Sequence, residues 1–558
     1  MMARSRPHRM VGGDCVTGIM PSPSGMSRLT ERKRAGPAAA AVVAGLFSLL
    51  PLAFVQWPPL IDYLPHLARV LVEHSLLTDG RFANRFMWHL RVVPNLGFDA
   101  AVLPLMLLGV PLAWAGKLFV AVVILLNGAA VIILHRALFG RLSPVPLIAF
   151  GFSYTELLIF GFLTSELSVA LALIAFATYL RGRVTVSSAR LLAFVAGSVV
   201  VLFFVHLLGA LVFLGLIAAN VVASRWIAPA LARLAVLFEP PRGHAAPLAP
   251  TMFAVGVGAL VLLVLFTLAP VSASNTGDDA ASLTDLLQLK LWRWSLIINP
   301  LLGYDLRVDL PVLAAISAAL LLFRDRLRIA GTTLLAMAGL TIAYFLVPAG
   351  WGSTYYIPER FPFILMLLGI ASIDLELPTR PARHATAVVI LLMVLARSLS
   401  ATVAWNGAAE ARRPLFEALS QTRPEDKVCQ ARNAKGNIHG DAMFPFMNLT
   451  SYATIATGAF AYVFALPDQN VVIPRPDWAP MLKRMETNNR VDNNPVRPLP
   501  NQDLANPAVL ETCTLMLVTR PNLYQLAFPD ALQRLIEVPG ATLYRVEHKL
   551  VPSATYHQ

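Results

Sequence analysis

Long apolar runs repeat along most of this chain and constrain its fold more than any other feature. They lie near residues 37–55, 99–113, 117–135, 143–161, 165–180, 189–205, 207–222, 250–270, 310–323, 329–347, 361–376 and 385–404. Backbone N–H and C=O groups find no water to hydrogen-bond within a lipid bilayer. Such runs therefore cross it as helices, whose backbone hydrogen bonds are made within the segment. Only 14% of the 558 residues are charged, against about 25% in soluble domains. The sequence therefore predicts a mainly α, polytopic transmembrane helix bundle.

Short basic clusters between the runs predict the orientation of the bundle, because positive loops stay in the cytosol. These clusters contain Arg136 and Arg141, Arg181 and Arg183, Arg225 and Arg233, Arg324 to Arg328, and Arg380 with Arg383. All fall on one side if the run 99–113, broken by Pro104 and Pro111, does not cross. About eleven crossings then remain within residues 37–404, with the C-terminal part outside.

The N-terminal tail, residues 1–36, is polar and basic. Its composition predicts a disordered cytosolic segment, in which Met26 is a second possible start. The net charge of the chain is +13, but its basic residues are dispersed between apolar runs. This dispersal is typical of membrane loops, so no nucleic-acid partner is expected.

From about residue 405 the composition changes, and residues 405–558 are expected to form a small α/β domain in the periplasm. The stretches "DKVCQA", "CTLMLVT" and "ATLYRVE" predict short buried strands. The stretch "PDALQRLIEVPG" predicts a helix ended by Pro-Gly. Cys429 and Cys513 both fall here; they are either a disulfide, if the domain is exported, or two unrelated buried thiols.

The predicted outer loops are residues 56–98, 271–309 and 348–360, and the first contains the stretch "IDYLPHLAR". Pro65 suits the first turn of a helix that places His66 and Arg69, two candidate substrate-binding residues, on one face. Asp62 precedes that helix near its positive end, which favours an ionised carboxylate. Such a group can act as a general base or hold a divalent metal, or it can simply cap the helix.

Asp99 ends the same loop and returns the chain to the membrane. It either faces the same cleft as Asp62, as a second catalytic acid, or caps the following helix. Arg69 and the other cations of the loop either bind an anion or pair with its carboxylates.

The later outer loops carry further candidates for substrate binding. Lys290 and Arg293 lie three residues apart in an amphipathic stretch, which either rests on the membrane surface or grips a lipid phosphate. Arg360 stands at a membrane entry, where its planar fork of donors matches a phosphate. Tyr356 either stacks on a sugar or belongs to an interfacial aromatic belt.

Three ionisable residues, Glu166, His206 and Arg397, fall inside apolar runs. Burying such groups in lipid is costly, so they usually line a cavity or pair with a partner. Glu166 and His206 either line a cavity near the outer ends of their helices or pair with each other.

With "IDYLPHLAR", "HRALFGR", the basic loop around Lys290, "PERF" at 358–361 and the C-terminal domain, the chain resembles glycosyltransferases of the GT-C superfamily. The resemblance implies transfer of a sugar from a polyprenyl-phosphate donor to a hydroxyl of a glycan, lipid or protein. It places the reaction at the outer face of the bacterial inner membrane. Asp62 would be the base or a ligand of Mg²⁺ or Mn²⁺, and Lys290, Arg293 and Arg360 would contact phosphate. The first loop lacks an adjacent acidic pair, which leaves the metal open.

Two other classes of function remain compatible with the sequence. A lipid or solute transporter would use Glu166, His206 and Arg397 as a path, although polar residues are few and repeated halves are absent. A non-catalytic assembly protein would use the exported domain to bind a partner and would not need Asp62.

Overall fold

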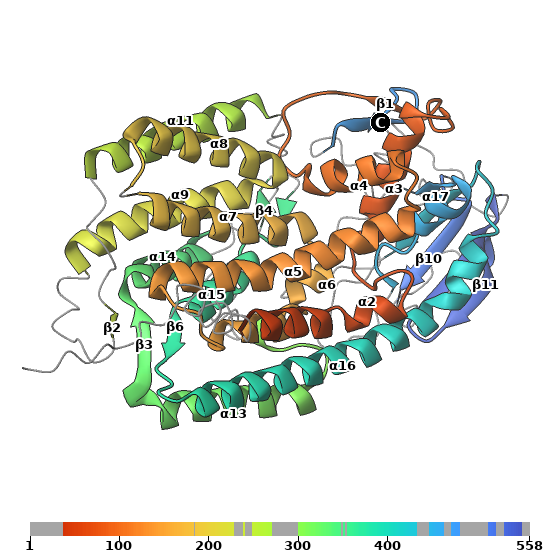
Figure 1. Cartoon of the computed structure of the whole chain (residues 1–558). Helices are drawn as coiled ribbons and strands as arrows, with labels where there is room; N and C mark the ends of the chain where they lie inside the picture. The colour runs from red at the N-terminus through yellow and green to blue at the C-terminus, as the bar shows by residue number, and fades with distance from the viewer. Residues whose placement is uncertain are drawn as a thin grey trace, which may run out of the picture.

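The computed structural model describes residues 37–183, 185–227, 238–239, 248–269, 299–347, 350–351, 354–431, 446–461, 470–479, 512–519 and 529–548. Helices dominate the part nearest the N-terminus, and Figure 1 shows most of them running side by side. The longer ones are α3 (Tyr63–Leu77), α5 (Leu112–Phe139), α7 (Leu163–Gly182), α8 (Ser188–Val205), α9 (Leu207–Val222), α11 (Leu248–Leu268), α13 (Leu306–Leu322), α14 (Gly331–Leu346) and α16 (Arg380–Leu419). The shorter ones are α2 (Leu50–Phe54), α4 (Gly97–Leu107), α6 (Glu156–Phe160), α15 (Arg360–Ala371) and α17 (Ser451–Thr457).

Six of the described helices are long and apolar enough to cross a bilayer, and five shorter apolar helices accompany them. The predicted integral membrane protein is thus confirmed in its architecture, while the count of about eleven crossings stays a prediction. Helix α4 has 11 residues and contains Pro104. At about 1.5 Å per residue it covers roughly half of the hydrocarbon thickness. This length agrees with the expectation that the run 99–113 does not cross.

One apolar run reaches across the bundle without a regular α-helix. Residues Val145–Phe152 form a 3-10 helix, η1, and α6 follows it. A 3-10 helix rises about 2 Å per residue, so this broken segment extends farther than an α-helix of equal length. It leads from Arg141 at one end of the bundle to Gly161 beside α3 at the other.

Two small sheets mark the opposite ends of the bundle in Figure 1. One end carries a three-stranded sheet of order β2-β3-β6, formed by Phe238–Glu239, Leu327–Ala330 and Ile373–Leu375. The other end carries α3, α17 and the C-terminal sheet. The basic clusters at Arg141, Arg324 to Arg328 and Arg380 therefore lie together at the end away from Asp62. The sequence predicted that these clusters share one side of the membrane.

The C-terminal part forms a five-stranded mixed sheet of order β11-β12-β10-β7-β8. Its strands are β7 (Lys427–Ala431), β8 (Phe460–Ala461), β10 (Leu515–Thr519), β11 (Leu532–Val538) and β12 (Ala541–Val546). The three predicted strands correspond to β7, β10 and β12 and are confirmed. Cys429 of β7 and Cys513 before β10 form a disulfide bond, so the first of the two alternatives for these cysteines holds.

The helix predicted over "PDALQRLIEVPG" is wrong. Residues Pro529–Ala531 form a short 3-10 turn, and Leu532–Val538 pair with β12 as an antiparallel strand. Pro539 and Gly540, which were taken as a helix end, form the hairpin turn instead, with Gly540 at φ +93°. Pairing of the strand with β12 outweighs the helical pattern of the segment, since β propensity is set by neighbours in the sheet.

The first outer loop and the C-terminal domain pack against each other as one unit. The sequence had assigned them to two different domains. Strand β1 (Phe86–Trp88) pairs antiparallel with β9 (Val472–Pro474), and α17 packs on α3. The guanidinium of Arg85 donates hydrogen bonds to the carbonyls of Gly458 and Pro424, at 2.8 and 2.7 Å. Helix α16 also runs through the predicted boundary at residue 404 without a break.

Candidate active site

Asp62 occupies the N-cap position of α3, but its carboxylate makes no capping hydrogen bond. Its Oδ1 instead accepts a hydrogen bond of 2.9 Å from Nδ2 of Asn448. Asn448 belongs to the C-terminal domain, is 3% exposed and adopts a left-handed backbone with φ +56°. The sequence alternative of a helix-capping aspartate therefore does not account for this carboxylate.

The turn that follows α6 holds the backbone of Asp62 in place. The N–H of Asp62 donates to the carbonyl of Phe160 at 3.0 Å, and the N–H of Ile61 donates to that of Ile159 at 2.9 Å. Gly161 closes this turn with φ +79°, a conformation that L side chains rarely adopt. A Cβ atom on Gly161 would lie 2.8 Å from the backbone nitrogen of Asp62. Only glycine fits this close approach.

Arg360, the first residue of α15, reaches the same turn from another part of the chain. Its guanidinium carbon lies 4.7 Å from the centroid of the Phe162 ring, a cation–π geometry. Its Nη1 contacts Nε2 of His206, between α8 and α9, at 2.8 Å. Its Nε is buried and makes no hydrogen bond to any described residue. A buried donor without a partner is costly, and an anion at this position would satisfy it.

Electrostatics couple Arg360 to the acids around it. Burial lowers the pKa of Arg360 to about 10, while the carboxylates of Glu359 and Asp62 act in the opposite direction. Arg360 therefore remains charged at neutral pH, and it remains within the electrostatic range of Asp62.

His206 is neutral in this arrangement. Burial and the neighbouring charge of Arg360 hold the pKa of His206 well below its usual value. Arg360 Nη1 and the backbone N–H of Leu208 contact the two ring nitrogens of His206, Nε2 at 2.8 Å and Nδ1 at 3.2 Å. His206 thus lies against Arg360 as a neutral ring and orients its guanidinium.

An aromatic group borders the turn beside Asp62 and Arg360. The rings of Phe160 and Phe162 stack with centroids 5.3 Å apart, and the ring of Tyr356 lies 4.7 Å from that of Phe160. Tyr356 has a backbone φ of +57°, which is uncommon for a residue other than glycine. The predicted substrate-binding Tyr356 therefore lies close to Asp62 and Arg360, next to an apolar surface on which a sugar ring can stack.

The comparisons with known proteins concern the fold. No family model and no curated protein matches the chain. Two solved structures of ArnT resemble it. Both are ArnT from Cupriavidus metallidurans, one in the apo state and one bound to undecaprenyl phosphate. The apo structure has 12% identity and a TM-score of 0.47, and covers 95% of this chain and 99% of its own. The bound structure has 13% identity and a TM-score of 0.46, and the match covers 96% of this chain and 100% of that structure.

A third solved structure, the arabinofuranosyltransferase AftD from Mycobacteria, has 17% identity and a TM-score of 0.39. It covers 92% of this chain and 40% of its own length. Because the TM-scores are below 0.5 and the identities below 25%, the chemistry of this chain rests on its own side chains.

Arg69 and Asp99, both predicted in the site, pair with each other. Arg69 donates from Nε and Nη2 to the two carboxylate oxygens of Asp99, at 2.7 and 2.9 Å, and from Nη1 to Oδ1 of Asn470 at 2.9 Å. Nδ1 of His66 lies 3.0 Å from Nη2 of Arg69. Arg69 is therefore paired with groups of the protein itself. Of the two alternatives for the cations of this loop, anion binding or pairing with its carboxylates, the second holds for Arg69. Arg69 thereby joins α3, α4 and the C-terminal domain.

Glu73 completes this buried cluster. Burial and the negative charge of Asp99 raise the pKa of Glu73 to about 9, although Arg69 acts against them. The side chain is therefore a neutral acid at pH 7. A neutral Glu73 adds no second negative charge beside Asp99, so the single charge of Arg69 is balanced.

The two other predicted phosphate contacts, Lys290 and Arg293, lie outside the described residues. Three residues of the site were not predicted as such: Asn448, Gly161 and Phe162. The sequence marks His206 only as an ionisable residue in an apolar run, and its pairing with Arg360 needs the fold. No local signal identifies Asn448, because its partner lies 386 residues away.

Glu166 and His206 do not pair with each other, so that alternative is wrong. Glu166 is fully buried, accepts a hydrogen bond of 2.8 Å from Nδ2 of Asn127 and lies 3.5 Å from the hydroxyl of Thr155. Arg397 forms a 2.6 Å ion pair with Asp309 and donates to the carbonyl of Gly151 at 2.6 Å. These two groups therefore hold helices together.

The divalent metal expected at Asp62 stays a prediction. Within the described ranges no three His, Cys, Asp or Glu residues cluster as a metal site would. Asp62 accepts a hydrogen bond from the amide of Asn448, and its charge acts on Arg360. Mg²⁺ and Mn²⁺ require several oxygen ligands.

Proposed function

We propose that the chain is a membrane glycosyltransferase that moves a sugar from a polyprenyl-phosphate donor to a hydroxyl acceptor. The observation that carries the proposal is the convergence of Asp62 and Arg360 on the turn Phe160–Phe162. A base for a hydroxyl and a cation for a phosphate are the two groups that this reaction needs. Segments far apart in the chain supply them to this one turn.

In the proposed reaction Asp62 takes the proton of the acceptor hydroxyl. The acceptor oxygen attacks the anomeric carbon, and the bond from that carbon to the phosphate oxygen breaks. The lipid phosphate leaves with the bonding electron pair, and Arg360 stabilises its growing negative charge. Asn448 fixes one carboxylate oxygen of Asp62, and His206 with Phe162 orients Arg360. Tyr356 and the neighbouring phenylalanines offer a face for the sugar.

We place this reaction at the outer face of a bacterial inner membrane, with the N-terminus in the cytosol and the C-terminal domain in the periplasm. The disulfide between Cys429 and Cys513 supports export of that domain, because such bonds persist in oxidising compartments. Asp62 lies at the same end of the bundle as that domain. A divalent cation at Asp62 remains a prediction, and no step above uses one.

The test of this proposal is the Asp62→Asn variant, with Asp325→Asn as a control. Asp325 is 90% exposed and lies at the other end of the bundle. Both variants, produced at matched amounts in membranes, are assayed in proteoliposomes for transfer of labelled sugars from a panel of polyprenyl-phosphate donors. The envelope glycans of the producing cells are profiled in parallel.

We expect Asp62→Asn to lose product by about 100-fold or more, since general-base catalysis contributes roughly 10²–10⁴-fold. Asp325→Asn should match the wild type. Unchanged product in the folded Asp62→Asn variant would contradict the proposal. If the wild type forms no product but moves lipids across the liposome bilayer, the transporter alternative gains support.

A further inference from the structure

A second polar site lies at the end of the bundle away from Asp62. A pocket of about 530 Å³ opens there between the turn after α5 and the start of α16. Its charged lining residues are Arg141, Arg326, Asp374, Glu376 and Arg383. The proposed transfer reaction uses none of them, so the pocket needs its own explanation.

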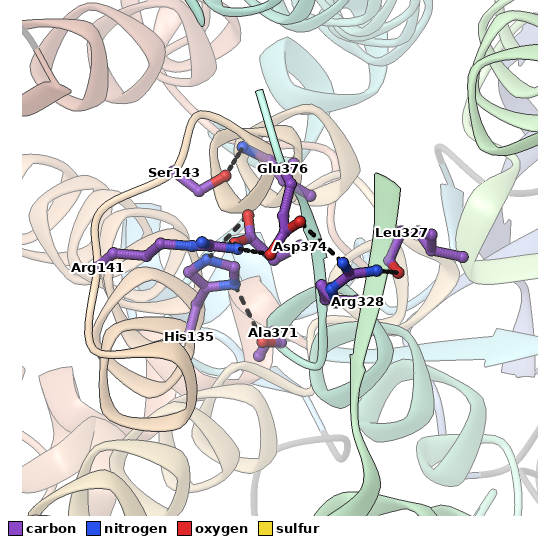
Figure 2. A network of polar contacts seen from close by, with 9 residues as sticks. His135, Arg141, Ser143, Leu327, Arg328, Ala371, Asp374 and Glu376 are labelled. Carbon is purple, nitrogen blue, oxygen red and sulfur yellow. Dashed lines mark hydrogen bonds and ion pairs between the residues drawn. The ribbon is translucent and has the colours of Figure 1, made fainter. Parts of the chain in front are cut away.

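The acids of this pocket are already balanced by partners in the protein. Figure 2 shows Asp374 at the centre of a network, held by Arg141 from one side and facing His135. Asp374 is fully buried, and Arg141 Nη2 lies 2.6 Å from its Oδ2. Arg328 lies 2.9 Å from the carboxylate of Glu376. The floor of the pocket is therefore a set of ion pairs with little charge left over.

The arginines at the mouth are not balanced in this way. Arg326 and Arg383 line the pocket and are exposed, and neither forms an ion pair with any residue that the structure describes. Arg141 adds a third guanidinium whose side chain is 41% exposed. Two unpaired guanidiniums above a neutral floor make a site that favours an anion. The planar donor forks of arginine suit a phosphate group.

The surroundings of the mouth indicate where that phosphate comes from. Helix α13 ends just before Arg326 with exposed apolar side chains, Leu322 at 77% and Phe323 at 40%. Helix α16 continues beyond Arg383 with Val389 and Leu392 exposed at 50% and 60%. Figure 1 shows α13 and α16 side by side. In a membrane these faces meet acyl chains, so the arginines stand at headgroup level.

We propose that this pocket binds the phosphate of an anionic membrane lipid, whose acyl chains lie along α13 and α16. Basic pockets at the ends of membrane helices suit such headgroups. Arg326 and Arg383 bind the phosphate, while the Asp374 network keeps the floor rigid. The site lies on the leaflet opposite the one that holds Asp62 and is distinct from the proposed donor site.

The test is equilibrium binding of a fluorescent phosphatidylglycerol to the purified, delipidated full-length protein in detergent. The test variant is Arg326→Gln with Arg383→Gln, and the control is Arg136→Gln with Arg324→Gln. The control removes the same charge, since Arg136 and Arg324 are exposed cations of the same end outside the pocket lining. Phosphatidylcholine and inorganic phosphate serve as competitors. Elution from a sizing column checks that each variant is folded.

We expect the Kd to rise about fivefold for each arginine removed, or about 25-fold for the test variant. The control should change by less than about twofold, and millimolar inorganic phosphate should not displace the lipid. Equal losses in both variants would overturn the proposal in favour of diffuse surface charge. Displacement by phosphate at the affinity of the lipid would overturn it in favour of a soluble anion. Unchanged binding in the test variant would refute the site.

Discussion

Asn448 donates a hydrogen bond of 2.9 Å to the carboxylate of Asp62 across 386 residues of sequence. The donor belongs to the C-terminal domain, and the acceptor belongs to the loop after the first apolar run. The candidate base is therefore oriented by a different domain. The docking of that domain, through α17 on α3 and β9 on β1, becomes a condition for the proposed activity.

The Asn448→Gly variant tests this contact. Glycine adopts the φ of +56° without strain and removes the whole side chain, including the amide that donates to Asp62. A hydrogen bond to a charged group contributes about 1.5–3 kcal/mol, so we expect product formation to fall roughly 10- to 100-fold. The measurement is the transfer rate in proteoliposomes at saturating donor. Wild-type rates in Asn448→Gly would show that the bond does not orient the base.

Gly161→Ala should disable the site through the backbone. The added Cβ would meet the nitrogen of Asp62 at 2.8 Å at a φ of +79°, so the turn or Asp62 must move. We expect a loss of activity of at least about tenfold, because small displacements of reacting groups are costly. Gly407→Ala is the matched control, since nothing lies within 4 Å of the Cβ it would gain. Equal activities for the two variants would disprove the proposed role of the turn.

Arg360→Lys separates charge from geometry. Lysine keeps the positive charge but loses the planar fork that stacks on Phe162 and offers the buried Nε. We expect the KM for the lipid donor to rise about tenfold, with a further loss of kcat. Arg413→Lys, in an ion pair whose side chains are 65% exposed, should change neither constant. If Arg360→Lys leaves both constants unchanged, only the charge is required.

Glu73 predicts a pH dependence of stability. Its pKa is about 9 in the folded protein and 4.5 in an exposed side chain, so the folded state holds the proton more tightly. The stability that Glu73 contributes is complete below about pH 4.5 and is lost as the pH rises towards 9. Glu73→Gln cannot ionise and should raise the apparent Tm at pH 8 but not at pH 4.5.

The measurement for Glu73→Gln is thermal unfolding in detergent at one fixed heating rate. Its control is Glu410→Gln, which changes an exposed ion pair. A gain worth at least about 1 kcal/mol at pH 8 is expected, since one pKa unit corresponds to about 1.4 kcal/mol. An equal Tm difference at both pH values would show that Glu73 does not titrate in this range.

Much of the architecture was available from the sequence. Apolar runs and basic clusters predict membrane helices and their shared sides, because burial in lipid depends on the local composition of each segment. The strands β7, β10 and β12 follow from short apolar patterns in the same way. The chemical types of Asp62 and Arg360, a carboxylate and a guanidinium in predicted outer loops, also singled them out.

Tertiary structure alone decided which of these groups meet. Arg69 and Asp99 looked like further site residues, yet they satisfy each other, while Asn448 carried no local mark and reaches Asp62. The segment Leu532–Val538 reads as a helix but gains more by pairing with β12. The physical reason is the same in each case. A local sequence pattern predicts whether one segment is buried in lipid or exposed to water. Contacts between distant segments depend instead on how the whole chain packs to reach its lowest free energy.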